Sequence, residues 1–150
     1  MSTPDNGPLL AIAEPLIKGE EACRLTAYQD TRNIWTIAWG RADIGVVPGM
    51  TCTQAQADQW FDAKVKALVG ALDRLLPWWR SMDLPRQAVL LSMAYQMGVG
   101  GVSRFPKALE AMERGCFATA ASQMLASEWA KQTPNRARRA AEIMRTGELP

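Results

Sequence analysis

Glu21 and Asp30 are the pair of residues whose types and positions could do acid–base chemistry together. The 150-residue chain contains no histidine, which excludes a Ser-His-Asp triad, a Cys-His pair and a histidine-ligated zinc site. General acid–base catalysis must therefore come from Asp, Glu, Lys, Tyr or Cys. Glu21 is expected at the end of a short helix and Asp30 in the turn of the following hairpin, so both carboxyls can face one cleft. Such a pair suits glycosidic bond hydrolysis, which needs one protonated acid and one ionised carboxylate.

The alternative is that Glu21 is an ordinary surface residue of its helix and Asp30 an ordinary turn-forming residue. The elements that would position them are predicted from hydrophobic period and turn residues. A short helix over 9–13 is stopped or restarted at Pro15 and runs on to about residue 21 or 22. Two strand-like segments follow at 24–28 and 34–39, joined by turn residues, with a third short strand predicted near 44–47.

The helical period begins at Thr53, which forms a capping box with Gln56 and starts a helix predicted over 53–76, before Pro77. Glycines and prolines separate the remaining predicted helices, which cover about 83–97, 106–114, 117–126, 128–131 and 134–145. The sequence thus predicts a single α+β domain, 1–150, that is mostly helical. A small N-terminal lobe of about 13–60 contains the β-hairpin, and the long helix of about 53–76 joins it to a helical lobe of about 77–150, to which segment 1–12 belongs.

The composition excludes several classes of protein. The net charge of +2, from 17 Lys and Arg and 15 Asp and Glu, is too small to indicate nucleic acid or a membrane surface. Three widely spaced cysteines, Cys23, Cys52 and Cys116, are expected to be reduced thiols. No apolar run reaches the ~20 residues of a membrane span, and the N-terminus lacks the positive start of a signal peptide. We therefore expect neither a signal peptide nor a transmembrane anchor.

The segment from Glu21 to Gly40 resembles the catalytic segment of the phage-type lysozymes. Their pattern is Glu, eight residues, Asp, five residues, Thr, and Glu21, Asp30 and Thr36 have that spacing. A second block also resembles this family, and the T-even phage lysozymes in particular; it comprises Tyr95-Gln96-Met97-Gly98, Trp129, Gln132-Thr133-Pro134-Asn135-Arg136 and Arg145-Thr146-Gly147. Two blocks in the right order, within about residues 13–147, are more specific than one short motif.

The resemblance implies a phage lysozyme-like fold and an endolysin-type muramidase. Such an enzyme hydrolyses the β-1,4 bond between N-acetylmuramic acid and N-acetylglucosamine in bacterial peptidoglycan. Glu21 would be the general acid, and Asp30 and Thr36 would assist the attack of water, with inversion at the anomeric carbon. The resemblance also implies that Arg136 is the charge partner of the acid, Glu21. It implies three substrate-binding residues, which are Tyr95, Gln96 and Gln123.

Several of these residues have a second interpretation. Glu20 is the rival acid, although it faces about 100° away from Glu21 around the helix. Tyr95 could equally be a core aromatic residue. Arg136 could simply anchor the last helix to the first; an arginine beside a carboxyl favours its ionised form, whereas a general acid must carry a proton. The basic residues of the last helix are interpreted as a solvated face rather than a binding patch: Arg136, Arg138, Arg139 and Arg145.

Three residues depart from the family pattern. Ala22 and Ala38 stand where the family usually has glycine, and Arg41 stands where it usually has histidine. An alanine costs about 1 kcal/mol or more wherever the backbone needs a positive φ. Arg41 changes the character of any ion pair at its position.

The resemblance implies no metal and no cofactor. It implies peptidoglycan as the substrate, no nucleic acid, no stable membrane insertion and a monomer. An endolysin would accumulate in the host bacterial cytoplasm and would need a holin-type permeabilising partner to reach the wall. The main competing interpretation is a non-catalytic peptidoglycan-binding module of the same fold. A basic nucleic-acid binder is disfavoured by a pI near 8.5.

Overall fold

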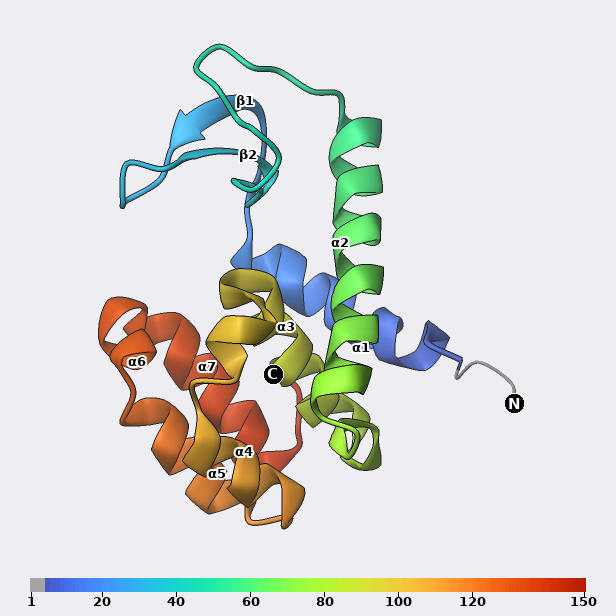
Figure 1. Cartoon of the computed structure of the whole chain (residues 1–150), viewed down its shortest axis with the longest axis vertical. Coiled ribbons are helices and arrows are strands. Elements are labelled where there is room, and N and C mark those ends of the chain that lie inside the picture. Colours follow the sequence, from blue (N-terminus) through green and yellow to red (C-terminus); the bar gives the residue numbers. More distant parts are fainter. Residues whose placement is uncertain (1–4) are drawn as a thin grey trace.

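The computed structural model describes residues 5–150, and residues 1–4 of the expected segment 1–12 lie outside the described part. The described chain contains seven α-helices and a two-stranded antiparallel sheet (Figure 1). The α+β, mostly helical class is therefore confirmed. The elements are α1 (Gly7–Glu20), β1 (Cys23–Gln29), β2 (Trp35–Trp39), α2 (Gln54–Leu75), a 3₁₀ helix η1 (Trp79–Ser81), α3 (Leu84–Val102), α4 (Pro106–Glu113), α5 (Phe117–Leu125), α6 (Glu128–Gln132) and α7 (Pro134–Thr146).

Helix α1 is continuous, so the predicted interruption at Pro15 is wrong. Proline lacks the N–H that would donate to the carbonyl four residues earlier, which ordinarily breaks or kinks a helix. Here Leu9, Ala13 and Ile17 follow one another at four-residue steps and are all buried. Burial of this stripe against α3 keeps the helix in one piece and carries it to Glu20.

The hairpin pairs Arg24 with Ala38 and Tyr28 with Thr36, with a bulge between the two pairs. Ala38 has a φ of +60° and is fully buried. Ala38 and Ala22 both stand where the family usually has glycine. Of the two, Ala38 has a left-handed backbone conformation, whereas Ala22 has no positive φ. Gly40, where the candidate site begins, directly follows the last residue of β2.

The third strand predicted near 44–47 is absent from the described residues, and this prediction is wrong. Gly45 and Gly49 have φ values of +75° and +83°, which breaks an extended conformation on both sides of Pro48. The hairpin is extended instead a few residues later, where Thr51 bridges Thr26. The Ala27 N–H also donates to the Met50 carbonyl at 2.8 Å.

Helix α2 begins with the predicted capping box. The Gln56 N–H donates to Thr53 Oγ1 at 3.1 Å, and the Thr53 N–H donates to Gln56 Oε1 at 2.9 Å. The apolar face of α2 is buried at Phe61, Val65, Val69 and Leu72. In Figure 1 this helix runs from the level of the hairpin down beside the other helices, so it joins the two parts of the molecule.

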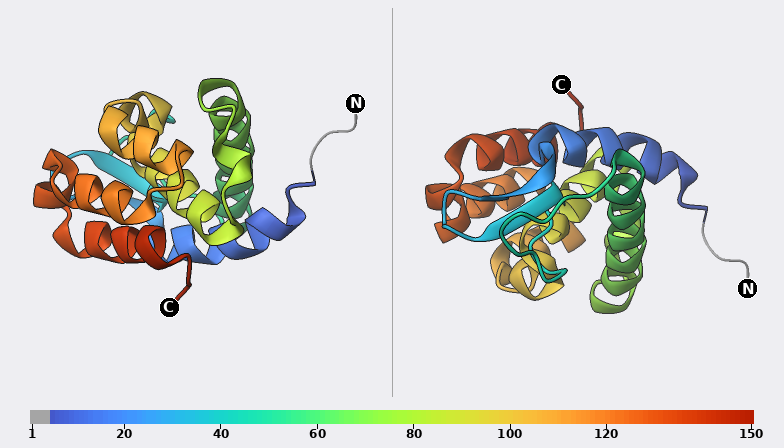
Figure 2. Two further views of the ribbon diagram at one scale, coloured as in Figure 1. Left: turned by 90° about the horizontal axis from the view of Figure 1, so that it is seen from below. Right: turned by 90° about the horizontal axis from the view of Figure 1, so that it is seen from above.

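The remaining helices lie within a residue or two of their predicted ranges, except that α3 extends to Val102. The break predicted at Gly98 is present as a kink, with a φ of +75° at that residue. The helices enclose the larger of two cores, to which α1 contributes, and a smaller core lies under the hairpin around Ile37, Ala38 and Ala57. Figure 2 shows α1 lying against the other helices, and Figure 1 shows the hairpin at the opposite end of the molecule from α4 and α5.

Candidate active site

Glu21 is the first residue after α1, and its side chain is held by an arginine from the last helix. Its N–H still donates to the Ile17 carbonyl at 2.8 Å. Arg136 Nη1 donates to Glu21 Oε1 at 2.6 Å, and the two side chains are only 12% and 16% exposed respectively. Arg136 Nη2 also lies 3.2 Å from Ser92 Oγ. Helices α1, α3 and α7 therefore converge on one carboxyl group.

Glu20 points into a different environment. Arg139 binds both of its carboxylate oxygens, with Nε at 2.7 Å and Nη2 at 2.8 Å, and Arg136 Nε lies 3.8 Å away. The hydrogen bond from Arg139 lowers the pKa of Glu20 from its ordinary value of 4.5, against the opposing effect of burial. Glu20 is thus engaged between α1 and α7 and does not line the cleft that contains Glu21.

Asp30 is fixed by the turn that it forms. Its Oδ1 accepts hydrogen bonds from the N–H groups of Arg32 at 2.8 Å and Ile34 at 2.9 Å. The Asn33 N–H donates to the Asp30 carbonyl at 2.9 Å, with Asn33 in a left-handed conformation. The turn occupies one carboxylate oxygen and leaves Oδ2 without a hydrogen bond among the described residues, so it can accept from a ligand or water.

Thr36 lies on β2 and is only 4% exposed. Its hydroxyl donates to the Ile34 carbonyl at 2.9 Å. This hydrogen bond fixes the orientation of the hydroxyl group and leaves an oxygen lone pair able to accept another hydrogen bond. Thr36 and the carboxyls of Glu21 and Asp30 line one cavity of about 600 Å³. Other residues that line it are Tyr28, Gly40, Gln96, Gln132, Thr133 and Arg136.

Gly40 forms the wall beside the Glu21 carboxyl. Its φ is +67°, and a Cβ added there would lie 2.2 Å from Glu21 Oε2. The sequence predicts a strand that ends at residue 39 but gives no indication of this approach. The signal available was a glycine directly after an aromatic strand, which often marks a close backbone contact.

Tyr95 lines the cleft, but most of its side chain is buried, and its stacking on a sugar stays a prediction. The side chain is 2% exposed and packs against Phe61, with ring centroids 5.4 Å apart. Its hydroxyl donates to the Trp39 carbonyl, and burial raises the pKa of Tyr95 well above its ordinary value of 10. Tyr95 therefore ties α3 to the end of β2.

Gln96 is half-buried at the edge of the cleft. Its Oε1 accepts a hydrogen bond from Trp129 Nε1 at 2.8 Å. This contact fixes the orientation of the amide and leaves its NH₂ group without a hydrogen bond among the described residues.

Gln123 lies elsewhere, so its assignment to the substrate site is not supported by its position. It lines a separate cavity of about 220 Å³ together with Arg104 and Ser127. Helix α5 packs on α4 and α7, at the end of the molecule away from the hairpin (Figure 1).

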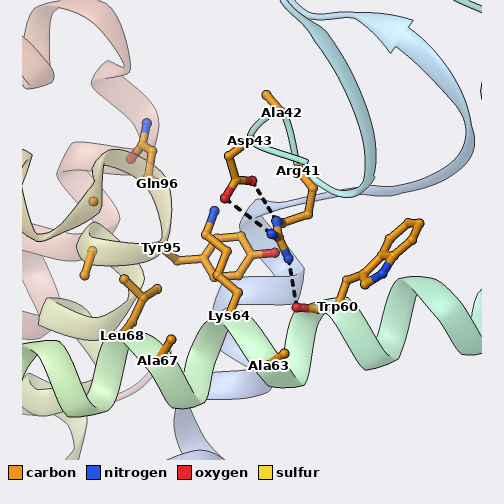
Figure 3. Close-up of a pocket in the computed structure, with 13 residues that line it drawn as sticks. Arg41, Ala42, Asp43, Trp60, Ala63, Lys64, Ala67, Leu68, Tyr95 and Gln96 are labelled. Atoms are coloured by element: carbon orange, nitrogen blue, oxygen red, sulfur yellow. Dashed lines mark hydrogen bonds and ion pairs between the residues drawn. The ribbon is translucent and has the colours of Figure 1, made fainter. Parts of the chain in front are cut away.

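A second cavity of about 670 Å³ adjoins the first (Figure 3). Both cavities are lined by Gly40, Ala42, Tyr95 and Gln96. At its rim, Arg41 Nε and Nη2 donate to the two carboxylate oxygens of Asp43 at 2.8 and 3.3 Å. These hydrogen bonds lower the pKa of Asp43.

Residues 5–150 contain no group of three or more His, Cys, Asp or Glu side chains arranged to hold a metal ion. The three cysteines are free thiols. None of the described helices has the length and apolar character needed to span a membrane.

The comparisons with known proteins point in one direction. A family model described as phage lysozyme matches residues 18–142. The chain is 31% identical over 170 positions to the pre-baseplate central spike protein Gp5 of Enterobacteria phage T4, covering 97% of this chain and 29% of that protein. It is 24% identical to probable T4-type lysozyme 1 of Dictyostelium discoideum, covering 94% and 98% of the two chains. A shorter match, 46% identical over 52 residues, joins it to the endolysin of Lactococcus phage c2, covering 33% of this chain and 22% of that one.

Proposed function

Because the chain belongs to the phage lysozyme family, and is thus a glycosidase, we propose that it hydrolyses the β-1,4 bond between N-acetylmuramic acid and N-acetylglucosamine in peptidoglycan. The observation that carries this proposal is the shared cleft. Glu21, Asp30 and Thr36 all line it, although they come from a helix end, a turn and a strand.

In this mechanism Glu21 gives its proton to the glycosidic oxygen as the bond from that oxygen to the anomeric carbon breaks. A water molecule held by Asp30 Oδ2 and Thr36 Oγ1 attacks the anomeric carbon and passes a proton to Asp30. The turn hydrogen bonds on Asp30 Oδ1 support this role, because they orient the carboxylate before substrate arrives. Attack by a separate water gives inversion, as the general two-carboxylate scheme requires.

Arg136 holds the Glu21 carboxyl in place, because Arg136 Nη1 donates to Glu21 Oε1 at 2.6 Å. We therefore assign Arg136 a positioning role in this mechanism.

The test compares Glu21→Gln with Glu20→Gln, an identical change one residue earlier and outside the cleft. Release of reducing ends from purified peptidoglycan should fall by about 10²–10⁴-fold in Glu21→Gln. Glu20→Gln should retain the rate, because Glu20 does not line the cleft and its shortest ion pair is with Arg139, which also lies outside it. Equal rates for Glu21→Gln and the parent would remove Glu21 from the role of acid.

The competing function is a binding module of the same fold. It predicts that the parent protein sediments with peptidoglycan but releases no reducing ends. The Glu21→Gln variant would then bind the wall as well as the parent.

We propose further that the protein acts as a monomeric endolysin that reaches the wall from the host cytoplasm with a holin-type partner. Light scattering tests the monomer. Expression in bacteria with and without a holin tests the route, since lysis should require the holin. Lysis that occurs only when the protein is added from outside would instead favour entry from the exterior; one relative is named as a spike protein.

A further inference from the structure

Lys64 lies in the cavity that adjoins the catalytic cleft. It is on α2, is half-buried, and makes no ion pair or hydrogen bond within residues 5–150. Its Nζ lies 4.1 Å from the centroid of the Tyr95 ring. Burial lowers the pKa of Lys64, while the charge of Asp43 opposes that effect.

The charges around this cavity do not balance. Arg41 already binds both oxygens of Asp43 and also donates to the Trp60 carbonyl at 2.9 Å. Two cations and one anion therefore line the cavity, and its remaining side chains are mostly apolar or small. Figure 3 shows Lys64 and Arg41 reaching into the same space beside Tyr95. A cation in such surroundings gains most from a negatively charged ligand, because little water shields it.

The cavity also adjoins the catalytic cleft. Four residues line both, and Gly40 stands between the Glu21 carboxyl and the second cavity. A polymer that places one bond at Glu21 therefore extends its neighbouring groups over Lys64. The ligand of the second cavity should be part of the same substrate.

We propose that this cavity is a subsite for a carboxylate of the substrate, bound by Lys64 and supported by Arg41. The inference rests on the proposed function and makes Lys64 a specificity-determining residue. Peptidoglycan offers carboxylates of two origins. Peptide-free strands carry the lactyl carboxylate of the muramic acid, whereas substituted strands use that group in an amide and carry carboxylates on the stem peptide. Both present the same chemistry to an ammonium group.

The test uses Lys64→Gln with Lys66→Gln as the matched control, since Lys66 is on the same helix but exposed and outside the cavity. Soluble glycan fragments are prepared with free carboxylates and with the same carboxylates amidated. The KM of Lys64→Gln should rise about tenfold on the free carboxylates, as expected for a charge-assisted hydrogen bond. Its kcat should change less than about twofold, and its KM on amidated fragments should equal that of the parent.

One further variant and two kinds of substrate make the result specific. Lys64→Arg keeps the charge and should restore most of the KM, which a purely structural role would not predict. A KM effect on peptide-free strands identifies the lactyl carboxylate, and an effect confined to substituted strands identifies the stem peptide. Thermal unfolding of each variant shows that it is folded.

An unchanged KM in Lys64→Gln, or an equal rise on amidated and free fragments, would overturn this inference while leaving the hydrolytic activity of the parent intact. If the parent releases no reducing ends from any fragment, the proposed function fails instead. Calorimetric measurement of the binding of the same fragments then tests the subsite independently of hydrolysis. Weaker binding of the carboxylate fragment by Lys64→Gln supports it, and equal binding refutes it.

Discussion

Gly40→Ala should disable the site with little damage to the fold. The new Cβ would lie 2.2 Å from Glu21 Oε2, which must move about 1.2 Å to reach an ordinary contact of 3.4 Å. The clash is with the far end of a side chain, so the carboxyl swings aside and leaves the backbone in place. A misplacement of about 1 Å can cost about 10²-fold in rate, and we expect a loss of that order in kcat/KM.

Gly45→Ala is the matched control. Gly45 has a similar φ of +75° in the same part of the chain, but an added Cβ meets nothing within 4 Å. Both variants pay about 1–2 kcal/mol for an alanine at positive φ, reduced by about 0.4–1 kcal/mol because alanine restricts the unfolded chain. Their free energies of unfolding, measured in urea, should therefore fall by a similar amount of about 1 kcal/mol, while only Gly40→Ala loses activity. Equal activity of the two variants would refute the argument that Gly40 makes room for the acid.

Other variants test separate contacts. In Arg139→Gln, the free energy of unfolding should fall below that of the parent at pH 7. The difference should shrink as the pH falls below 4.5 and through the lowered pKa of Glu20, because the ion pair is lost when Glu20 gains a proton; a pH-independent gap in urea unfolding would contradict this. Ala38→Gly should relieve about 1–2 kcal/mol of backbone strain. It also removes a buried methyl group worth about 0.8 kcal/mol and makes the unfolded chain more flexible, which costs about 0.4–1 kcal/mol. The free energy of unfolding should therefore stay within about 1 kcal/mol of the parent's, and a larger change in either direction would contradict this balance. Tyr95→Phe should lose about 1 kcal/mol of stability because its hydrogen bond is removed, and its kcat/KM should stay within about threefold of the parent's. A hundredfold loss of kcat/KM would instead indicate that Tyr95 contacts the substrate. Gln123→Ala should clear peptidoglycan at the parent's rate, and a slow variant would bring Gln123 back into the site.

Features set by neighbouring residues could be predicted from the sequence. The capping box at Thr53 and Gln56 needs only a turn of helix to form. The placement of Glu21, Asp30 and Thr36 on one cleft follows from a short helix end, a turn and a strand that are consecutive in the chain.

Features set by distant packing could not be predicted in this way. Pro15 is tolerated only because α3 covers the helix that contains it. Tyr95 is buried because Phe61 comes from another helix, and the spacing of a motif carries no information on that burial. Lys64 likewise has no ion-pair partner among the described residues because Arg41 binds the carboxylate of Asp43.

The ion pair between Glu21 and Arg136 also has a consequence for the order of events during synthesis. The two residues are 115 positions apart. At about 5–20 residues per second, the ribosome adds Arg136 roughly 6–23 s after Glu21. Throughout that interval the acid residue has been made but its anchor has not, and α1 also waits for α3 to cover its apolar stripe. A nascent chain interrupted before α7 would therefore carry Glu21, Asp30 and Thr36 without the arginine that binds the Glu21 carboxyl. Under the proposed mechanism, such a chain would lack the positioned acid until the last helix is made.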